Sequence, residues 1–122
     1  MRKNSIKNTR INEEVKKALS SIIRNEIKDP RIHIMTSVTH VEVAPDLKTA
    51  KVYISVLGSD KEKEGTIKGL KSAEGFVRSA LAKEVNLRNT PKLFFEIDDS
   101  IEYGIHISNV LDGLKGNDHE ED

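Results

Sequence analysis

The sequence contains no cysteine and no tryptophan, and it has only two tyrosines and three phenylalanines in 122 residues. Without cysteine it has no thiolate nucleophile, no disulfide and no cysteine-containing zinc site. No apolar stretch reaches membrane-spanning length, and none follows the basic residues 1–5 as a secretory signal requires. The length is sufficient for one domain with its own core. We therefore expect a single domain that resides in the cytoplasm.

The charges are balanced in number but segregated along the chain. Lys and Arg together number 20, as do Asp and Glu, yet residues 1–92 hold 19 basic and 11 acidic residues, whereas residues 93–122 hold 1 and 9. Such an asymmetry predicts an interaction surface followed by an acidic tail. The alternative is an ordinary solvated surface on which the charge happens to be uneven.

The clearest predicted element is an amphipathic helix over residues 9–28. Its start can be capped by Asn8 or Thr9, and Pro30 ends it. One face is apolar and includes Ile11, Val15, Ala18, Leu19, Ile22, Ile23 and Ile27. Opposite this face, at roughly 100° per residue, lies a basic stripe of Arg10, Lys17, Arg24 and Lys28.

The middle of the chain alternates between apolar and polar residues at period two, which predicts two strands between Ile34 and Leu57. The turn chemistry of residues 44–48, with Pro45 and Asp46, predicts an antiparallel hairpin. Alternation is poor over residues 34–40, where a bulge is one explanation.

Helical spacing returns after a loop and cap at residues 58–60. It predicts one helix over residues 61–73 and another over residues 76–85, with Gly75 either ending the first helix or permitting a kink. Residues 93–97 alternate as a third strand, and Asp99 can cap a final helix that ends at Leu114. Residues 1–114 are thus predicted to form one domain, and residues 115–122 a disordered acidic tail.

The predicted fold class is α+β. The order of helix, strand, strand, helix, helix, strand matches the type II KH arrangement, in which helices cover one face of a three-stranded sheet, here with an added C-terminal helix. Several segments in this order resemble ribosome-binding factor A: Asp29-Pro30-Arg31, the hairpin run from Val41 to Tyr53, Ala73-Glu74-Gly75, the run from Leu87 to Leu93, and Asp99-Ser100 followed by Gly104.

The resemblance implies a non-enzymatic assembly factor. Such a protein binds the small (30S) ribosomal subunit and its 16S ribosomal RNA, assists late maturation and 5′-end processing of that RNA, and is important for growth in the cold. It further implies neither a membrane nor a small-molecule substrate as partner, and we expect a monomer. His106 stands where the family pattern leads us to expect arginine.

Basic side chains neutralise phosphates and release counterions, so the predicted RNA-binding residues are cationic. They are Arg10, Lys17, Arg24, Lys28, Arg31, Lys68, Lys71, Arg78, Arg88 and Lys92. In ordinary KH domains a GxxG loop between two helices admits the RNA backbone, and the corresponding helix junction here is Ala73, Glu74 and Gly75. Because the first glycine is missing and Glu74 is acidic, we expect the basic surface to contribute more than the junction. The alternative is a face that only keeps the protein in solution.

The remaining side chains point to no other chemistry. Phe76, Phe94 and Phe95 are predicted to lie in the core, so a sheet that stacks bases is not expected. The four histidines lack metal-ligand spacing, and neither a Walker loop nor a nucleophile elbow occurs. We therefore predict no catalytic residue, no metal and no cofactor. The competing functions are a general KH-like RNA-binding protein acting on other RNAs, a small α/β enzyme, and a protein interaction module.

Overall fold

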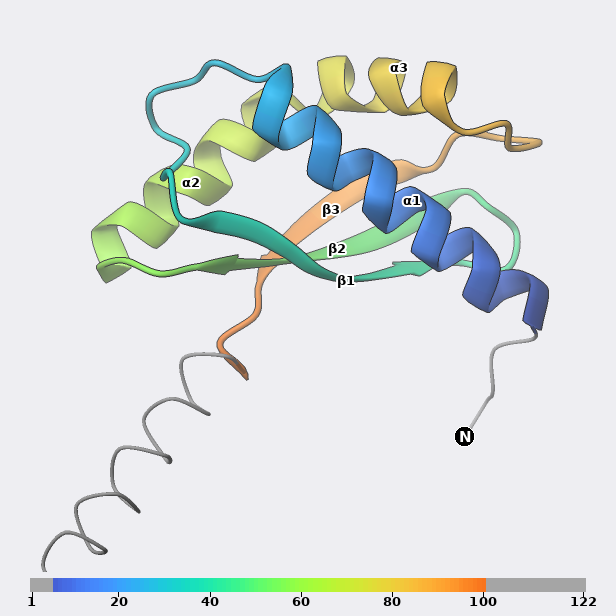
Figure 1. The fold of residues 1–122 in the computed structure, drawn as a ribbon, viewed down its shortest axis with the longest axis horizontal. Coiled ribbons are helices and arrows are strands. Elements are labelled where there is room, and N and C mark those ends of the chain that lie inside the picture. Colours follow the sequence, from blue (N-terminus) through green and yellow to red (C-terminus); the bar gives the residue numbers. More distant parts are fainter. Residues whose placement is uncertain (1–5, 101–122) are drawn as a thin grey trace, which may run out of the picture.

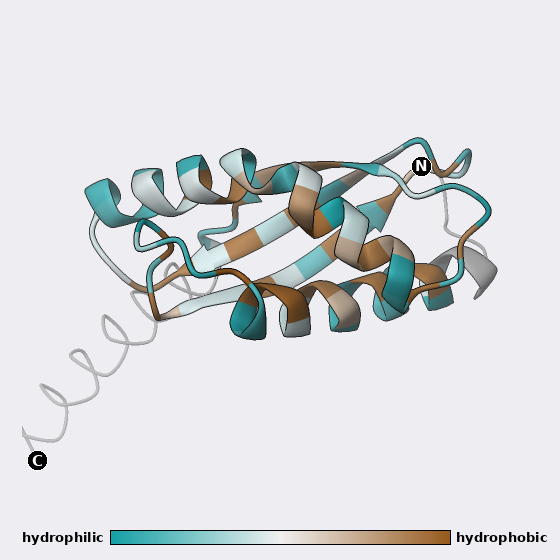
Figure 2. Cartoon of the chain, turned by 90° about the horizontal axis from the view of Figure 1, so that it is seen from above, coloured by the Kyte–Doolittle hydropathy of each residue, from teal (hydrophilic) through white to brown (hydrophobic). Residues whose placement is uncertain are grey.

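The computed structural model describes residues 6–100, in which three helices cover one face of a three-stranded sheet (Figures 1 and 2). The elements are α1 (Ile6–Asn25), β1 (Thr36–Val43), β2 (Thr49–Val56), α2 (Asp60–Ser72), α3 (Glu74–Glu84) and β3 (Lys92–Ile97). The predicted α+β class and element order are confirmed. The type II KH assignment stays a prediction, and the expected C-terminal helix and acidic tail lie outside the described residues.

Helix α1 is displaced from its predicted position at both ends. It begins at Ile6, so neither Asn8 nor Thr9 precedes it as a cap, and it ends at Asn25 instead of residue 28. The apolar spacing is confirmed, since Val15, Leu19 and Ile22 are fully buried. Beyond the helix, the N–H of His33 donates to the Thr66 hydroxyl and so ties the segment that follows α1 to α2.

Strands β1 and β2 form the predicted antiparallel hairpin, and the register shifts between Val38 and His40, which confirms the bulge. In the turn, the Asp46 carboxylate accepts from the N–H of Lys48, as its sequence position suggests. Leu47 has a φ of 62° while its side chain is buried. Burial of this side chain offsets the strain of a left-handed backbone at a residue other than glycine.

Helix α2 begins with a capping box, in which the Ser59 hydroxyl accepts from the N–H of Glu62 and the Glu62 carboxylate accepts from the N–H of Ser59. Its glycines, together with Thr66, contact residues 29–33. A Cβ atom added to Gly69 would lie 3.0 Å from Ile32 Cγ1, and one added to Gly65 would lie 3.5 Å from the Arg31 carbonyl oxygen. The two glycines therefore permit close packing, at a cost in helix propensity.

A single residue, Ala73, separates α2 from α3. Gly75 lies inside the first turn of α3, has no positive φ, and an added Cβ would meet nothing within 4 Å. Neither predicted role of Gly75 is therefore right: the break occurs two residues earlier. Strand β3 runs parallel to β2 and forms the far edge of the sheet.

The core lies between the helices and the inner face of the sheet, and Figure 2 shows apolar and polar residues alternating around each helix. Phe95 is in this core as predicted, with 3% of its surface exposed. The core prediction is wrong for Phe76 and Phe94, which are 53% and 45% exposed. Phe94 lies on the outer face because side chains alternate along β3. None of the described helices is long and apolar enough to cross a membrane.

Candidate nucleic-acid interface

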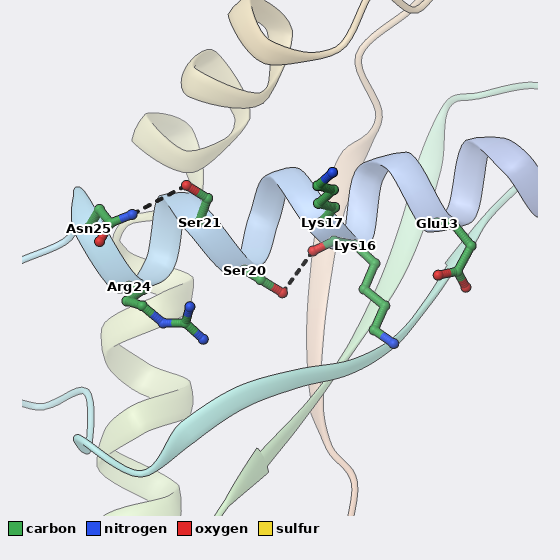
Figure 3. A pocket seen from close by; sticks show the side chains of 7 residues that line it. All are labelled: Glu13, Lys16, Lys17, Ser20, Ser21, Arg24 and Asn25. Atoms are coloured by element: carbon green, nitrogen blue, oxygen red, sulfur yellow. Dashed lines mark hydrogen bonds between the residues drawn. The ribbon is translucent and has the colours of Figure 1, made fainter.

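The outer face of α1 carries three of the predicted cations. Arg10, Lys17 and Arg24 are exposed and recur every seven residues, which is close to two helical turns. Figure 3 shows how Lys17 and Arg24 line an open hollow together with Glu13, Lys16, Ser20, Ser21 and Asn25. Lys16 and Arg24 extend on the side of the helix nearer β1, while Lys17 points away from it. Among residues 6–100, no ion pair neutralises Arg10, Lys17 or Arg24.

Lys28 and Arg31 do not extend this stripe, because both lie beyond the end of α1. Lys28 is exposed. Arg31 forms a two-pronged ion pair with Asp29, in which Nη2 lies 2.7 Å from Oδ2 and Nε lies 3.1 Å from Oδ1. The hydrogen bonds from Arg31 lower the pKa of the Asp29 carboxyl from 3.8 to about 2. The charge of Arg31 is thus already paired within its own loop.

A second candidate surface, with two lysines and two glutamates, lies at the free edge of β3. An open hollow there is lined by Lys71 and Glu74 from the helical layer and by residues 92–96 of the strand. The ammonium group of Lys92 lies 5.6 Å from the centre of the Phe94 ring, a cation–π distance. Two cations and an exposed aromatic ring therefore border one hollow. Phe94 lies at the surface, contrary to its predicted place in the core, and the alternation of Leu93, Phe94 and Phe95 along the strand indicates this outward position.

The helix junction borders the same hollow. Ala73 supplies no side-chain cap to α3, so the first N–H groups of this helix lack a side-chain acceptor. Gly75 leaves open space beside them. The start of α3 thus has no side-chain cap, and it follows one residue after the carbonyl end of α2. The Glu74 side chain does not cap the helix but contacts β3. Its Oε2 atom accepts a hydrogen bond from the N–H of Leu93 at 2.9 Å, and this satisfies one donor on the unpaired edge of the strand.

The other predicted cations are dispersed. Arg78 is partly buried and donates from both Nε and Nη2 to the Thr90 carbonyl, so it holds the segment between α3 and β3 in place. Asn89 in that segment donates to the Leu47 carbonyl of the hairpin turn. Lys68 and Arg88 are exposed. Arg78 thus has a structural task that its sequence position did not indicate.

The ten predicted cations therefore do not form one continuous surface. Helix α1 packs against β1 and α3, whereas α2 packs against β3 at the opposite edge of the sheet. The structure brings Lys71 and Lys92 together, and it separates them from Arg10, Lys17 and Arg24. Within residues 6–100, no three side chains of His, Asp or Glu gather as metal ligands would.

The comparisons with known proteins all lead to the same family. The family model described as ribosome-binding factor A matches residues 7–111. The ribosome-binding factor A of Lachnospira eligens is 64% identical over 120 residues, covering 98% of this chain and 92% of the relative. The solution structure of a Thermotoga maritima protein, described as a putative ribosome binding factor A, superimposes with a TM-score of 0.68 at 28% identity, covering 79% of this chain and 91% of the other.

A further match concerns a relative bound to the 30S subunit. It is a homology model of Thermus thermophilus ribosome binding factor A as fitted into the cryo-EM map of its 30S complex. The TM-score is 0.60 at 27% identity, and the match covers 72% of this chain and 91% of the other.

Proposed function

Because the chain belongs to the ribosome-binding factor A family, we propose that it binds the small ribosomal subunit through 16S ribosomal RNA and acts as an assembly factor without enzymatic activity. The observation that carries the proposal is the match to the Thermus thermophilus protein fitted into a 30S complex. The proposal also includes the finer expectations that the family resemblance implies. These are late maturation and 5′-end processing of the RNA, importance for growth in the cold, a cytoplasmic location and a monomeric state.

The edge of β3 supports an RNA contact by its chemistry. Lys71 and Lys92 present positive charge beside the uncapped start of α3, where Gly75 offers no obstruction to a phosphate group. Phosphates bind at such helix starts because N–H groups and the helix dipole both favour negative charge. The ring of Phe94 adds a surface for an unpaired base. The edge of β3 can thus hold a phosphate group and contact a base of the same RNA.

The outer face of α1 supports a second contact of a simpler kind. None of the seven side chains that line the hollow on α1 is aromatic, and cations of this kind suit recognition of phosphate placement along a folded RNA. Since α1 and β3 lie at opposite edges of the sheet, the two surfaces can touch separate RNA segments. A folded RNA such as that of a ribosomal subunit provides such segments close together.

Sedimentation with purified small subunits tests the proposal. The full chain should sediment with 30S particles, and its affinity should fall as salt rises, by a slope of about 0.9 per phosphate contact in log K against log salt. The double change Lys71→Glu and Lys92→Glu should weaken binding and lower this slope. The control, Lys61→Glu with Lys83→Glu, alters two exposed lysines elsewhere and should retain binding.

Two outcomes would contradict the proposal. Sedimentation with other RNA but not with small subunits would favour a general RNA-binding protein. If the protein sediments without small subunits or other RNA at every salt concentration tested, the result would favour a protein interaction module or an enzyme.

A further inference from the structure

The outer face of the sheet, opposite the helices, carries one aromatic ring on each strand. His40 lies on β1, Tyr53 on β2 and Phe94 on β3. Tyr53 and Phe94 each sit between two buried residues, and His40 lies between the bulge at Thr39 and the buried Val41. In Figure 1, α1, α2 and α3 all lie on the other side of these strands. Among the described elements, none covers the three rings.

The His40 and Tyr53 rings stack across the β1–β2 pair, and Phe94 stands diagonally from Tyr53 across the β2–β3 pair. His40 is paired with Tyr53, and their ring centres are 5.6 Å apart with an interplanar angle of 30°. Lys51 is paired with Phe94, and Tyr53 with Glu96, so Tyr53 and Phe94 are diagonal neighbours. The His40 side chain is 53% exposed and Phe94 is 45% exposed. Tyr53 between them is partly exposed, so a flat ligand can reach all three rings, Tyr53 to a lesser extent.

Charged side chains complete this face. Lys51 and Lys92 stand beside Phe94, and both are exposed. Glu42 lies near His40, with 3.5 Å between Oε2 and Nε2, and Glu96 lies beside Tyr53. Lysines next to rings suit the phosphates of a strand whose bases are stacked, and carboxylates accept hydrogen bonds from base amino groups such as that of cytosine. The combination fits unpaired RNA better than it fits a polyanion without bases.

We propose that His40, Tyr53 and Phe94 form a platform on which unpaired bases of single-stranded RNA stack, with Lys51 and Lys92 contacting the phosphates. The inference rests on the proposed RNA-binding function and extends it to a third surface. Phe94 borders both this platform and the hollow at the edge of β3, so a single strand can pass from one to the other. Tyr53 belongs to the platform alone and therefore distinguishes the two.

Fluorescence provides a direct test because the chain has no tryptophan. The variant Phe94→Trp places a single indole on the platform, and Met35→Trp places one at a similarly exposed position just before β1. Addition of a short oligocytidylate should quench the indole at position 94 and leave that at position 35 unchanged. Double-stranded RNA should quench position 94 much less, because its bases are already stacked. Equal quenching at both positions, or none at position 94, would overturn the platform.

Affinity measurements supply the second arm. Tyr53→Ala should weaken binding of the labelled oligocytidylate at least about fivefold, the lower end of what one stacked base contributes, while Tyr53→Phe should bind like the parent. Unchanged affinity of Tyr53→Ala, with thermal melting showing an intact fold, would exclude stacking there. Sedimentation with 30S subunits is measured on the same variants. If the parent sediments with subunits but the oligocytidylate effects are absent, the platform proposal is refuted and the proposed function is retained. If the parent does not sediment with subunits, the proposed function is refuted whatever the oligocytidylate result.

Discussion

The Glu74 carboxylate accepts a hydrogen bond from the main-chain N–H of Leu93, 2.9 Å away, and so ties the first turn of α3 to the free edge of β3. An acidic residue beside a surface proposed for RNA would weaken binding if it had no other task. Its task here is to satisfy a partly buried donor. This accounts for a carboxylate at a helix junction where phosphate binding alone would favour a neutral side chain.

Truncation of this side chain should therefore lower stability. We expect Glu74→Ala to cost about 1 to 3 kcal/mol of unfolding free energy, because the N–H of Leu93 is left without its acceptor. Glu74→Gln retains an acceptor oxygen and should lose less than half as much. Urea denaturation of the two variants measures the difference. Equal stability of Glu74→Ala and the parent would show that water replaces the carboxylate at no cost.

The glycines of α2 and α3 make a matched pair of tests. Gly69→Val should cost roughly 1 to 3 kcal/mol, since any Cβ there lies 3.0 Å from Ile32 Cγ1 and valine adds more atoms. Gly75→Val places the same side chain in open space and should be close to neutral in stability. Thermal unfolding compares them directly. Similar losses at both positions would show that the contact with Ile32 is not the cause.

Gly75→Val also tests the proposed phosphate site. The added side chain stands beside the uncapped N–H groups of α3, so binding to small subunits should weaken although the fold is retained. Binding like that of the parent would place the RNA contact elsewhere along β3.

The ion pair between Asp29 and Arg31 predicts a dependence of stability on acidity. Folding lowers the pKa of the Asp29 carboxyl from 3.8 to about 2. Stability from this pair is therefore fully present above pH 4 and is lost as the pH falls from about 4 to about 2. Thermal midpoints measured between pH 5 and pH 2 should fall less steeply in Asp29→Asn than in the parent. Parallel curves would show that the pair does not contribute.

Regular periodicity explains which parts of this structure could be predicted from the sequence. The spacing of Val15, Leu19 and Ile22 identifies the buried face of α1, and the turn chemistry around Asp46 identifies the hairpin. Strand β3 was predicted as an element, but its pairing with β2 depends on contacts between distant residues, such as the bond from Lys92 N–H to the Lys48 carbonyl. Pattern alone does not specify such a contact.

The candidate site was harder to predict because side-chain charge does not show what a side chain contacts. Arg31 and Arg78 belong to the predicted basic set, yet one pairs with Asp29 and the other with the Thr90 carbonyl. Gly69 and Gly75 look alike in the sequence, and only the three-dimensional contacts separate a packing glycine from an open one. Phe94 was assigned to the core on its hydrophobicity, although the alternation along β3 directs it outward.

Helix α1 should perform two separable tasks, one through its buried face and one through its basic stripe. Leu19 is fully buried, and Arg10, Lys17 and Arg24 project from the opposite side. The triple change Arg10→Glu, Lys17→Glu and Arg24→Glu should retain a cooperative thermal transition and abolish sedimentation with small subunits. New carboxylates near Glu13 and Glu14 cost about 0.2 to 0.5 kcal/mol per pair, which is small compared with the stability of a domain.

Leu19→Ala should have the opposite effect. It should lower the unfolding free energy by about 2 to 5 kcal/mol, because it removes buried methyl groups and leaves a cavity. The molecules that remain folded at low temperature should still bind, since the basic stripe is unchanged. If the triple variant folds and sediments with small subunits like the parent, the outer face of α1 only solvates the protein. RNA binding would then depend on the hollow at the edge of β3, where Lys71 and Lys92 lie.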